Sequence, residues 1–289
     1  MNLYFAANPS RKHLKLLKDC NAENMLMSFN FIKKTDIFIR LLDEYRPKNF
    51  ILDSGAFSVW ANGSTIDIDD YVRFCKELKE VLPKEINLTI VNLDVLPGKF
   101  GERPTDMERD ESASRGWDNM LKLESLGLKV IHVFHQHEDF SWLEKLKKHS
   151  DYIGISPAND VSMIEKHNWL NQVFSNLKVN ETKIKTHGFA VTSHTQLYKY
   201  PFYSVDSSSW VAPARFGRIP VFTDDLKIKS FQYKNKDGVL EYWDYIKHIG
   251  IQDLSGDDWR IRTSIAIKSY QNLEKIATRV WASRGIVFE

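Results

Sequence analysis

The feature that most constrains the fold is a regular alternation of short apolar runs with segments whose apolar residues have helical spacing. The apolar runs predict strands that begin at Asn2, Met25, Phe50, Leu88, Val130, Tyr152, Lys185 and Phe202. The clearest helices are expected over 66–82, 105–126 and 161–177. Strands that alternate with helices over short connections are typical of a parallel sheet, and eight such units predict an α/β fold of the TIM-type (β/α)8 barrel.

The segment after the eighth predicted strand departs from this alternation. No helix obviously follows 202–206, and the chain continues with a possible hairpin over 219–240 and with helices over 240–249 and 257–283. We therefore expect one catalytic domain over 1–289. Its barrel strands and helices occupy about 1–210, while 211–289 supply a basic loop or hairpin and helical decoration.

Composition limits the class of protein. The chain is 43% hydrophobic and 27% charged, which is ordinary for a soluble globular protein. Its two cysteines, Cys20 and Cys75, lie far apart and predict neither a disulfide framework nor a cysteine-rich zinc site. No apolar run approaches the roughly 20 residues that span a bilayer, and the first residues lack the features of a signal peptide. We expect a cytoplasmic protein.

Three predicted strands end in aspartate. Asp53 follows Phe50-Ile51-Leu52, Asp94 closes the run that begins at Leu88, and Asp206 closes the run that begins at Phe202. One acid at a strand end often only caps the next helix. If the three strands are parallel in one sheet, however, the three carboxylates converge at its C-terminal edge, where α/β barrels keep their active sites.

The stretch Leu52-Asp53-Ser54-Gly55-Ala56-Phe57 resembles the Asp-Ser-Gly-Gly-aromatic motif of the guanine transglycosylases, TIM-barrel enzymes that exchange guanine for a 7-deazaguanine base. Further segments resemble that family's motifs in the same order: Leu93-Asp94, Val133-Phe134-His135-Gln136, Tyr152-Ile153-Gly154-Ile155, His187-Gly188-Phe189-Ala190, Val205-Asp206 and Pro213-Ala214-Arg215-Phe216-Gly217-Arg218. The chain lacks the Cys-x-Cys-x-x-Cys zinc site of the tRNA-modifying members. Asp206 also lies three residues further from the Pro-x-Arg segment than the nucleophile does in the family pattern. It is most similar to the compact, phage-type branch that inserts 7-deazaguanines into DNA.

The resemblance implies a role for each matching residue. Asp206 is expected to be the nucleophile that holds C1′ covalently, and Asp53 the acid that protonates the departing base. Asp94 is expected to accept hydrogen bonds from the purine N1 and N2 hydrogens. The remaining roles are donation to O6 by Gln136 and the Gly154 backbone, stacking on the base by Phe57 and His187, and phosphate binding by Arg215 and Arg218. Apart from the resemblance, Trp210 lies near a basic stretch of the chain and is either a stacking surface for the nucleic acid or a core residue. No metal and no cofactor is implied.

The expected partners are DNA and a 7-deazaguanine base. The net charge is only +2, but the window 180–236 holds nine Lys and Arg against four Asp and Glu, either a nucleic-acid face or a solvated surface. One alternative is a tRNA substrate. Others are a metal-dependent barrel hydrolase that uses His132, His135 and His137, and a non-catalytic nucleic-acid binder.

Overall fold

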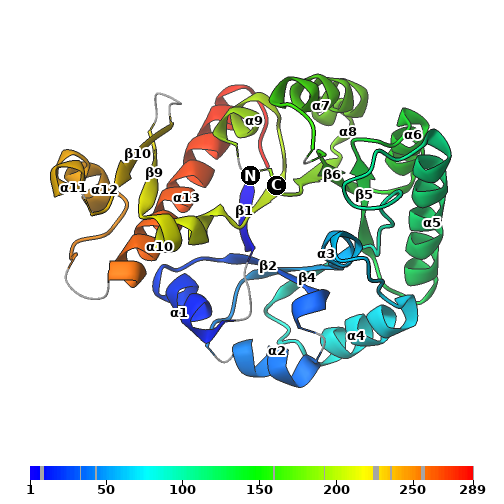
Figure 1. Cartoon of the computed structure of the whole chain (residues 1–289), viewed down its shortest axis with the longest axis horizontal. Coiled ribbons are helices and arrows are strands. Elements are labelled where there is room, and N and C mark those ends of the chain that lie inside the picture. The colour runs from blue at the N-terminus through cyan, green and yellow to red at the C-terminus, as the bar shows by residue number, and fades with distance from the viewer. Residues whose placement is uncertain are drawn as a thin grey trace.

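Eight parallel strands close into a barrel in the computed structural model, with each strand paired to the next and β8 paired to β1 (Figure 1). The structure describes residues 1–6, 10–32, 34–42, 44–158, 160–191, 193–223, 228–234, 236–254 and 258–288. The barrel strands are β1 (Asn2–Ala6), β2 (Asn24–Ser28), β3 (Asn49–Asp53), β4 (Asn87–Val91), β5 (Val130–His135), β6 (Tyr152–Ser156), β7 (Lys185–Gly188) and β8 (Ser204–Ser207). The predicted (β/α)8 barrel is confirmed.

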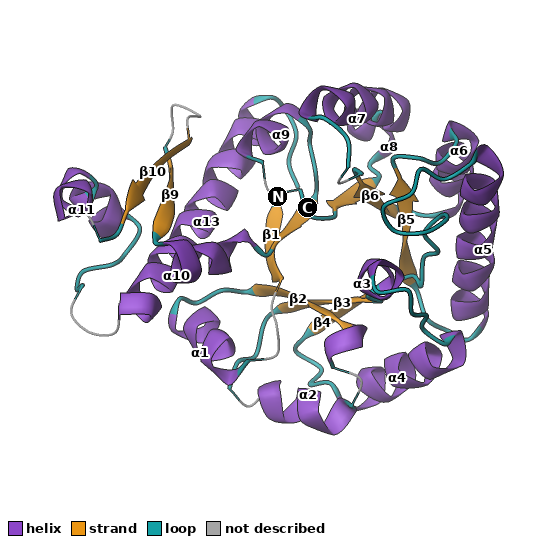
Figure 2. Ribbon diagram, in the orientation of Figure 1, coloured by secondary structure: helices purple, strands orange, loops and turns teal. Residues whose placement is uncertain are grey.

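Helices surround the barrel on all sides (Figure 2). Up to β8 they are α1 (Arg11–Asp19), α2 (Thr35–Leu42), α3 (Ala56–Ala61), α4 (Ile68–Val81), α5 (Asp106–Ser125), α6 (Phe140–His149), α7 (Met163–Leu177), α8 (Val179–Thr182) and α9 (His194–Lys199), with a 3-10 turn over Phe29–Phe31. Side chains cap several of them: Asp67 accepts from the N–H groups of Asp69 and Asp70 at the start of α4, and Thr105 and Glu108 form a capping box on α5.

The long C-terminal helix takes the place of the barrel helix that the sequence does not show after β8. Helix α13 (Asp258–Ser283) packs against β1 and contacts both α1 and α9 (Figure 1). Lys268 on it donates to the Cys20 carbonyl at 2.8 Å, and Trp281 donates to the Leu197 carbonyl at 2.7 Å. The predicted C-terminal helix, expected as decoration that closes the barrel, completes the ring of barrel helices.

The segment between β8 and α13 builds a small separate core. It contains a 3-10 turn (Ser209–Val211), α10 (Ala212–Phe216), the antiparallel pair β9 (Arg218–Phe222) and β10 (Ile228–Gln232), α11 (Lys236–Glu241) and α12 (Trp243–His248). Ile219, Phe231 and Ile246 pack there with Ile265 of α13. The predicted hairpin is confirmed, but β10 ends at Gln232 and α11 occupies Lys236–Glu241. Asp224, Asp225 and Lys227 of the basic window lie outside the described residues.

Alternation along the strands separates the barrel interior from its helical coat. Tyr4, Leu26, Ile51, Val91 and Val133 form one buried cluster inside the barrel, whereas neighbours such as Phe50 and Leu52 belong to the core beneath the helices. Residues two positions further along β3 and β5 therefore face the same interior at its C-terminal end. Among the described residues no helix is both long enough and apolar enough to cross a membrane.

Candidate active site

The three strand-end aspartates meet at one end of the barrel. Asp53 closes β3, Asp94 follows β4 and Asp206 lies in β8. Burial, together with repulsion from the charges of Asp94 and Asp206, raises the pKa of Asp53 to about 7. Because β3, β4 and β8 are parallel strands of one closed barrel, the three carboxylates lie at the same C-terminal edge, as we predicted.

A tight turn after β3 holds Asp53. Gly55 has a left-handed backbone with a φ of 82°, and its N–H donates to Asp53 Oδ2 at 3.1 Å. A Cβ at Gly55 would lie 2.4 Å from Ser28 Oγ and 2.9 Å from Asn30 Cβ. Only glycine fits here, which explains the Asp-Ser-Gly order read in the sequence.

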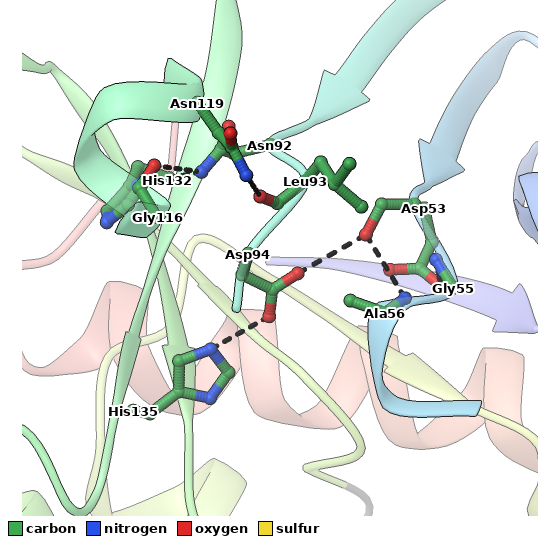
Figure 3. A network of polar contacts seen from close by, with 11 residues as sticks. Asp53, Gly55, Ala56, Asn92, Leu93, Asp94, Gly116, Asn119, His132 and His135 are labelled. Atoms are coloured by element: carbon green, nitrogen blue, oxygen red, sulfur yellow. Dashed lines mark hydrogen bonds and ion pairs between the residues drawn. The ribbon is translucent and has the colours of Figure 1, made fainter. Parts of the chain in front are cut away.

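Asp94 is held by hydrogen bonds to both carboxylate oxygens (Figure 3). Ser54 Oγ donates to Oδ1 at 3.2 Å, and His135 Nε2 lies 2.8 Å from Oδ2. Burial alone would raise the pKa of Asp94, but the hydrogen bond and charge of His135 lower it below its usual value. Burial would likewise lower the pKa of His135, but Asp94 raises it. The pair therefore favours an ionised Asp94 beside a protonated imidazole.

Helices α4 and α5 fix the segment that carries Asp94. Asn119 donates to the Leu93 carbonyl at 2.7 Å, and Asn92 donates to the Gly116 carbonyl at 2.9 Å (Figure 3). The Tyr71 hydroxyl donates to the Val91 carbonyl at 2.7 Å. The carbonyls that β4 leaves at its end are thus satisfied by helix side chains, and Asp94 is presented from a rigid support.

Asp206 is anchored through one oxygen. Its Oδ1 accepts the Ala190 N–H at 2.9 Å, and His187 Nε2 lies 3.4 Å from the same oxygen. Ala190 adopts a φ of 52°, which non-glycine residues rarely do, so the turn after β7 is held in a strained form that aims this N–H at the carboxylate. The Asp206 side chain keeps 11% of its surface exposed.

A pocket of about 150 Å³ opens beside this anchor, between the loops that follow β6 and β7. Its wall consists of Pro157, Met163, Lys166, Phe189, Ala190, Val191, Ser193 and Gln196. Because Ala190 both lines the pocket and donates to Asp206, the pocket adjoins the Asp206 side of the barrel mouth. Lys166, Ser193 and Gln196 give it polar groups that can hydrogen-bond a ligand.

Of the two residues predicted to read O6, Gln136 keeps its donor groups, whereas Gly154 has a different role. The Gln136 side chain accepts the Ala158 N–H through Oε1 at 2.9 Å, which ties it to the loop after β6 and leaves its amide N–H groups as donors. Gly154 lies in mid-strand between β5 and β7. A Cβ there would lie 2.7 Å from Phe189 Cε2, so the ring of Phe189 covers this backbone. Gly154 serves barrel packing in this structure.

Two predicted stacking residues are buried. His187 is fully buried inside the barrel, with its ring against Phe189 at a centroid distance of 4.5 Å and against Tyr4 at 5.8 Å. Its ring has no face at the mouth, so the expected stacking on the base does not fit. Trp210 is also fully buried and donates to the Ala6 carbonyl at 3.0 Å, which excludes it as a surface for nucleic acid.

Phe57 and the two arginines are exposed, as their predicted roles require. Phe57 is 46% exposed on α3, and its ring lies 5.8 Å from Trp60 and 6.3 Å from Phe100, which is 57% exposed. Arg215 is exposed on α10, and Arg218 is exposed on β9, where its Nε donates to Ser230 at 2.7 Å. Trp60 and Phe100 had not been singled out in the sequence.

The three histidines of the alternative metal site point in different directions. His132 is buried outside the barrel wall, where Asn92 donates to its Nδ1 at 2.9 Å and burial lowers its pKa to about 4. His135 contacts Asp94, while His137 Nε2 lies 3.8 Å from Asp160. Over the part of the chain that the structure describes, no three His, Cys, Asp or Glu side chains are placed to share a metal ion.

Sequence reasoning missed two groups of site residues. Ser54 was quoted only as part of a motif, and His135 was considered only as a metal ligand, whereas both are hydrogen-bonded to Asp94. Tyr152 and Ser204 form a hydrogen-bonded series with His187. They could have been predicted from the alternation of side chains along the strands, which places both on the inner face of the barrel. A scan against models of known protein families finds no match to this chain, and a search of curated proteins finds no significant match.

Proposed function

We propose that this chain is a base-exchange transglycosylase that replaces guanine in DNA with a 7-deazaguanine. The observation that carries the proposal is the meeting of three carboxylates in three different environments at the barrel mouth. One has a pKa of about 7, one is held ionised beside an imidazole, and one is anchored through a single oxygen. Acids with separated pKa values are the usual sign of divided acid, base and nucleophile roles.

Asp206 is the nucleophile of this mechanism. Its carboxylate attacks C1′ of the target nucleotide, the bond from C1′ to guanine breaks, and an aspartyl-nucleotide ester forms. With Oδ1 fixed by the Ala190 N–H, Oδ2 is the oxygen that can form this ester. The incoming base then attacks C1′ and releases Asp206, so the sugar–phosphate backbone is never cut.

Asp53 and Asp94 handle the bases. Asp53 gives a proton to the departing guanine and takes one from the incoming base, and a pKa of about 7 suits both steps near neutral pH. The ionised Asp94 accepts hydrogen bonds from N1–H and the N2 amino group, while Gln136 and the protonated His135 are donors suited to O6.

The DNA substrate is supported by exposed groups on α3, which follows β3, and on the segment that follows β8. A base inside a duplex cannot reach a barrel interior, so the target nucleotide must be flipped out or single-stranded. The exposed ring of Phe57 can stack on it, and the exposed side chains of Arg215 and Arg218 can bind phosphates.

Asp206→Asn tests the proposal, with Asp118→Asn, at an exposed position of α5, as control. Wild-type and control chains should incorporate labelled guanine into DNA, and DNA with 7-deazaguanine should trap an adduct that survives denaturing electrophoresis. Asp206→Asn should form no adduct and lose at least about 10³-fold in rate, because it removes the nucleophile. Exchange into tRNA alone would favour the tRNA alternative. Exchange into neither, or full exchange by Asp206→Asn, would overturn the proposal.

A further inference from the structure

A chain of buried polar groups runs up the inside of the barrel to Asp206. The Tyr152 hydroxyl lies 2.5 Å from Ser204 Oγ, and Ser204 Oγ lies 2.6 Å from His187 Nδ1. His187 Nε2 in turn lies 3.4 Å from Asp206 Oδ1. These four residues come from β6, β7 and β8, and their side chains share the inner face of the barrel.

For an imidazole that carries one hydrogen, only one direction of proton donation points an N–H, and not a lone pair, at the Asp206 carboxylate. Tyr152 stays protonated, because burial raises its pKa, so its O–H can donate to Ser204 Oγ. Ser204 then donates to Nδ1 of His187, which leaves the hydrogen of a neutral imidazole on Nε2, facing Asp206 Oδ1. In the opposite direction, Nδ1 would carry the hydrogen and a lone pair on Nε2 would face the carboxylate, which is repulsive.

His187 Nε2 has no hydrogen-bond partner of good geometry among the described residues, although it is fully buried. A buried N–H without a hydrogen-bond acceptor destabilises the folded state. Asp206 Oδ1, at 3.4 Å, is an acceptor within reach of Nε2. A small movement of the carboxylate closes this gap. Phe189 and Tyr4 pack against the imidazole and prevent the ring from turning away.

We propose that His187 is a positioning residue for Asp206. Its Nε2–H, fixed by the chain from Tyr152 through Ser204, holds Oδ1 together with the Ala190 N–H. Oδ2, to which no described residue donates, stays free to react. This inference rests on the proposed function only where it treats Asp206 as a nucleophile. The direction of the hydrogen bonds from Tyr152 to His187 can be measured without any activity.

Two substitutions separate positioning from packing. In His187→Gln the amide nitrogen can reach the place of Nε2, whereas in His187→Asn it reaches only the place of Nδ1. We expect His187→Asn to lose about 100-fold in kcat for guanine exchange with little change in KM, because the reacting oxygen is no longer held in place. His187→Gln should stay within about tenfold of wild type. His149→Gln is the matched control, since His149 pairs with Glu124 at 2.8 Å on the outside of the barrel.

Nitrogen NMR of the imidazoles tests the hydrogen-bond order in the folded wild-type chain. We expect His187 to be the Nε2–H tautomer, with His132, whose Nδ1 accepts from Asn92, as an internal reference. Ser204→Ala should reduce the population of that tautomer. An Nδ1–H tautomer of His187, or a folded His187→Asn with wild-type kcat, would overturn the inference. If the wild-type protein showed no guanine exchange, the proposed function would be wrong. The tautomer of His187 would still show whether its Nε2–H faces Asp206.

Discussion

The two sides of the barrel mouth hold their carboxylates in opposite ways. On the β3–β5 side, His135 lies level with Asp94 at 2.8 Å, and both side chains keep 13% of their surface exposed. On the β7–β8 side, His187 lies below Asp206 at 3.4 Å and is fully buried. The first imidazole can touch a ligand, whereas the second can act only through the acid above it.

Under the proposed function, this difference would divide the work of the site, with base binding on one side and covalent chemistry on the other. His135 favours the ionised form of Asp94 and offers a charged donor beside it, which suits recognition of a polar base. His187 contributes only polarity and rigidity, which suit a nucleophile that must not move. Asp53 belongs to neither pair, and its pKa of about 7 leaves it to exchange protons.

Apart from the loss of the nucleophile in Asp206→Asn, the largest effect should follow from Asp53→Asn. Removing a general acid and base of this kind should lower kcat for guanine exchange by about 10²- to 10⁴-fold. The wild-type rate should change slope near pH 7, where Asp53 titrates, and the variant should lose that change of slope. The check is a pH profile of exchange for both chains. A variant that kept the wild-type profile would move the acid–base role to another residue, of which Glu138, with a pKa raised by burial to about 7, is the first to test.

The same substitution should stabilise the fold at alkaline pH. Because the pKa of Asp53 is raised to about 7 in the folded protein, the folded chain keeps a proton between about pH 4 and 7 that the unfolded chain has released. Stability therefore falls as the pH rises through this window and stays low above it. Asparagine does not ionise, so Asp53→Asn should unfold with a free energy about 2–4 kcal/mol higher than wild type at pH 8. The measurement is denaturant unfolding of both chains.

That difference in stability should disappear near pH 4, where Asp53 is neutral in the folded protein. The control is Asp118→Asn, whose side chain is exposed and whose stability should match wild type at both pH values. Equal stability of Asp53→Asn and wild type at pH 8 would mean that burial and the charges of Asp94 and Asp206 do not raise the pKa of Asp53.

The sequence predicts the fold well because strand and helix periodicity is a local property. The eight strands and the acids at three of their ends follow from runs such as Phe50-Ile51-Leu52-Asp53. Helix α1 was missed, since four of its nine residues are Arg or Lys and only Leu14, Leu16 and Leu17 are buried. No helix was predicted directly after β8, because the helix that completes the barrel follows β8 only after a long insertion.

The site is harder to predict because it depends on contacts between distant residues. Gly154 leaves room for the ring of Phe189, which is 35 residues away in the sequence. Trp210 is buried and donates a hydrogen bond to the carbonyl of Ala6, at a separation of 204 residues. Likewise, alternation along β7 places His187 inside the barrel, but only the packing of Tyr4 and Phe189 shows that no ligand can reach it. Motif order can therefore identify the acids but not the partners of each acid.

The smallest effect, and the sharpest test of the contrast between the two histidines, is expected from His135→Gln. Glutamine keeps a donor for Asp94 but no charge, so the pKa of Asp94 should rise toward its usual value and the base should bind less tightly. We expect KM for guanine to rise about tenfold, or about 1.4 kcal/mol, with kcat nearly unchanged. His187→Asn, by contrast, should lower kcat and leave KM nearly unchanged. If His135→Gln lowered kcat instead, the β3–β5 side would take part in the chemical step, and the division between a binding side and a reacting side would fail.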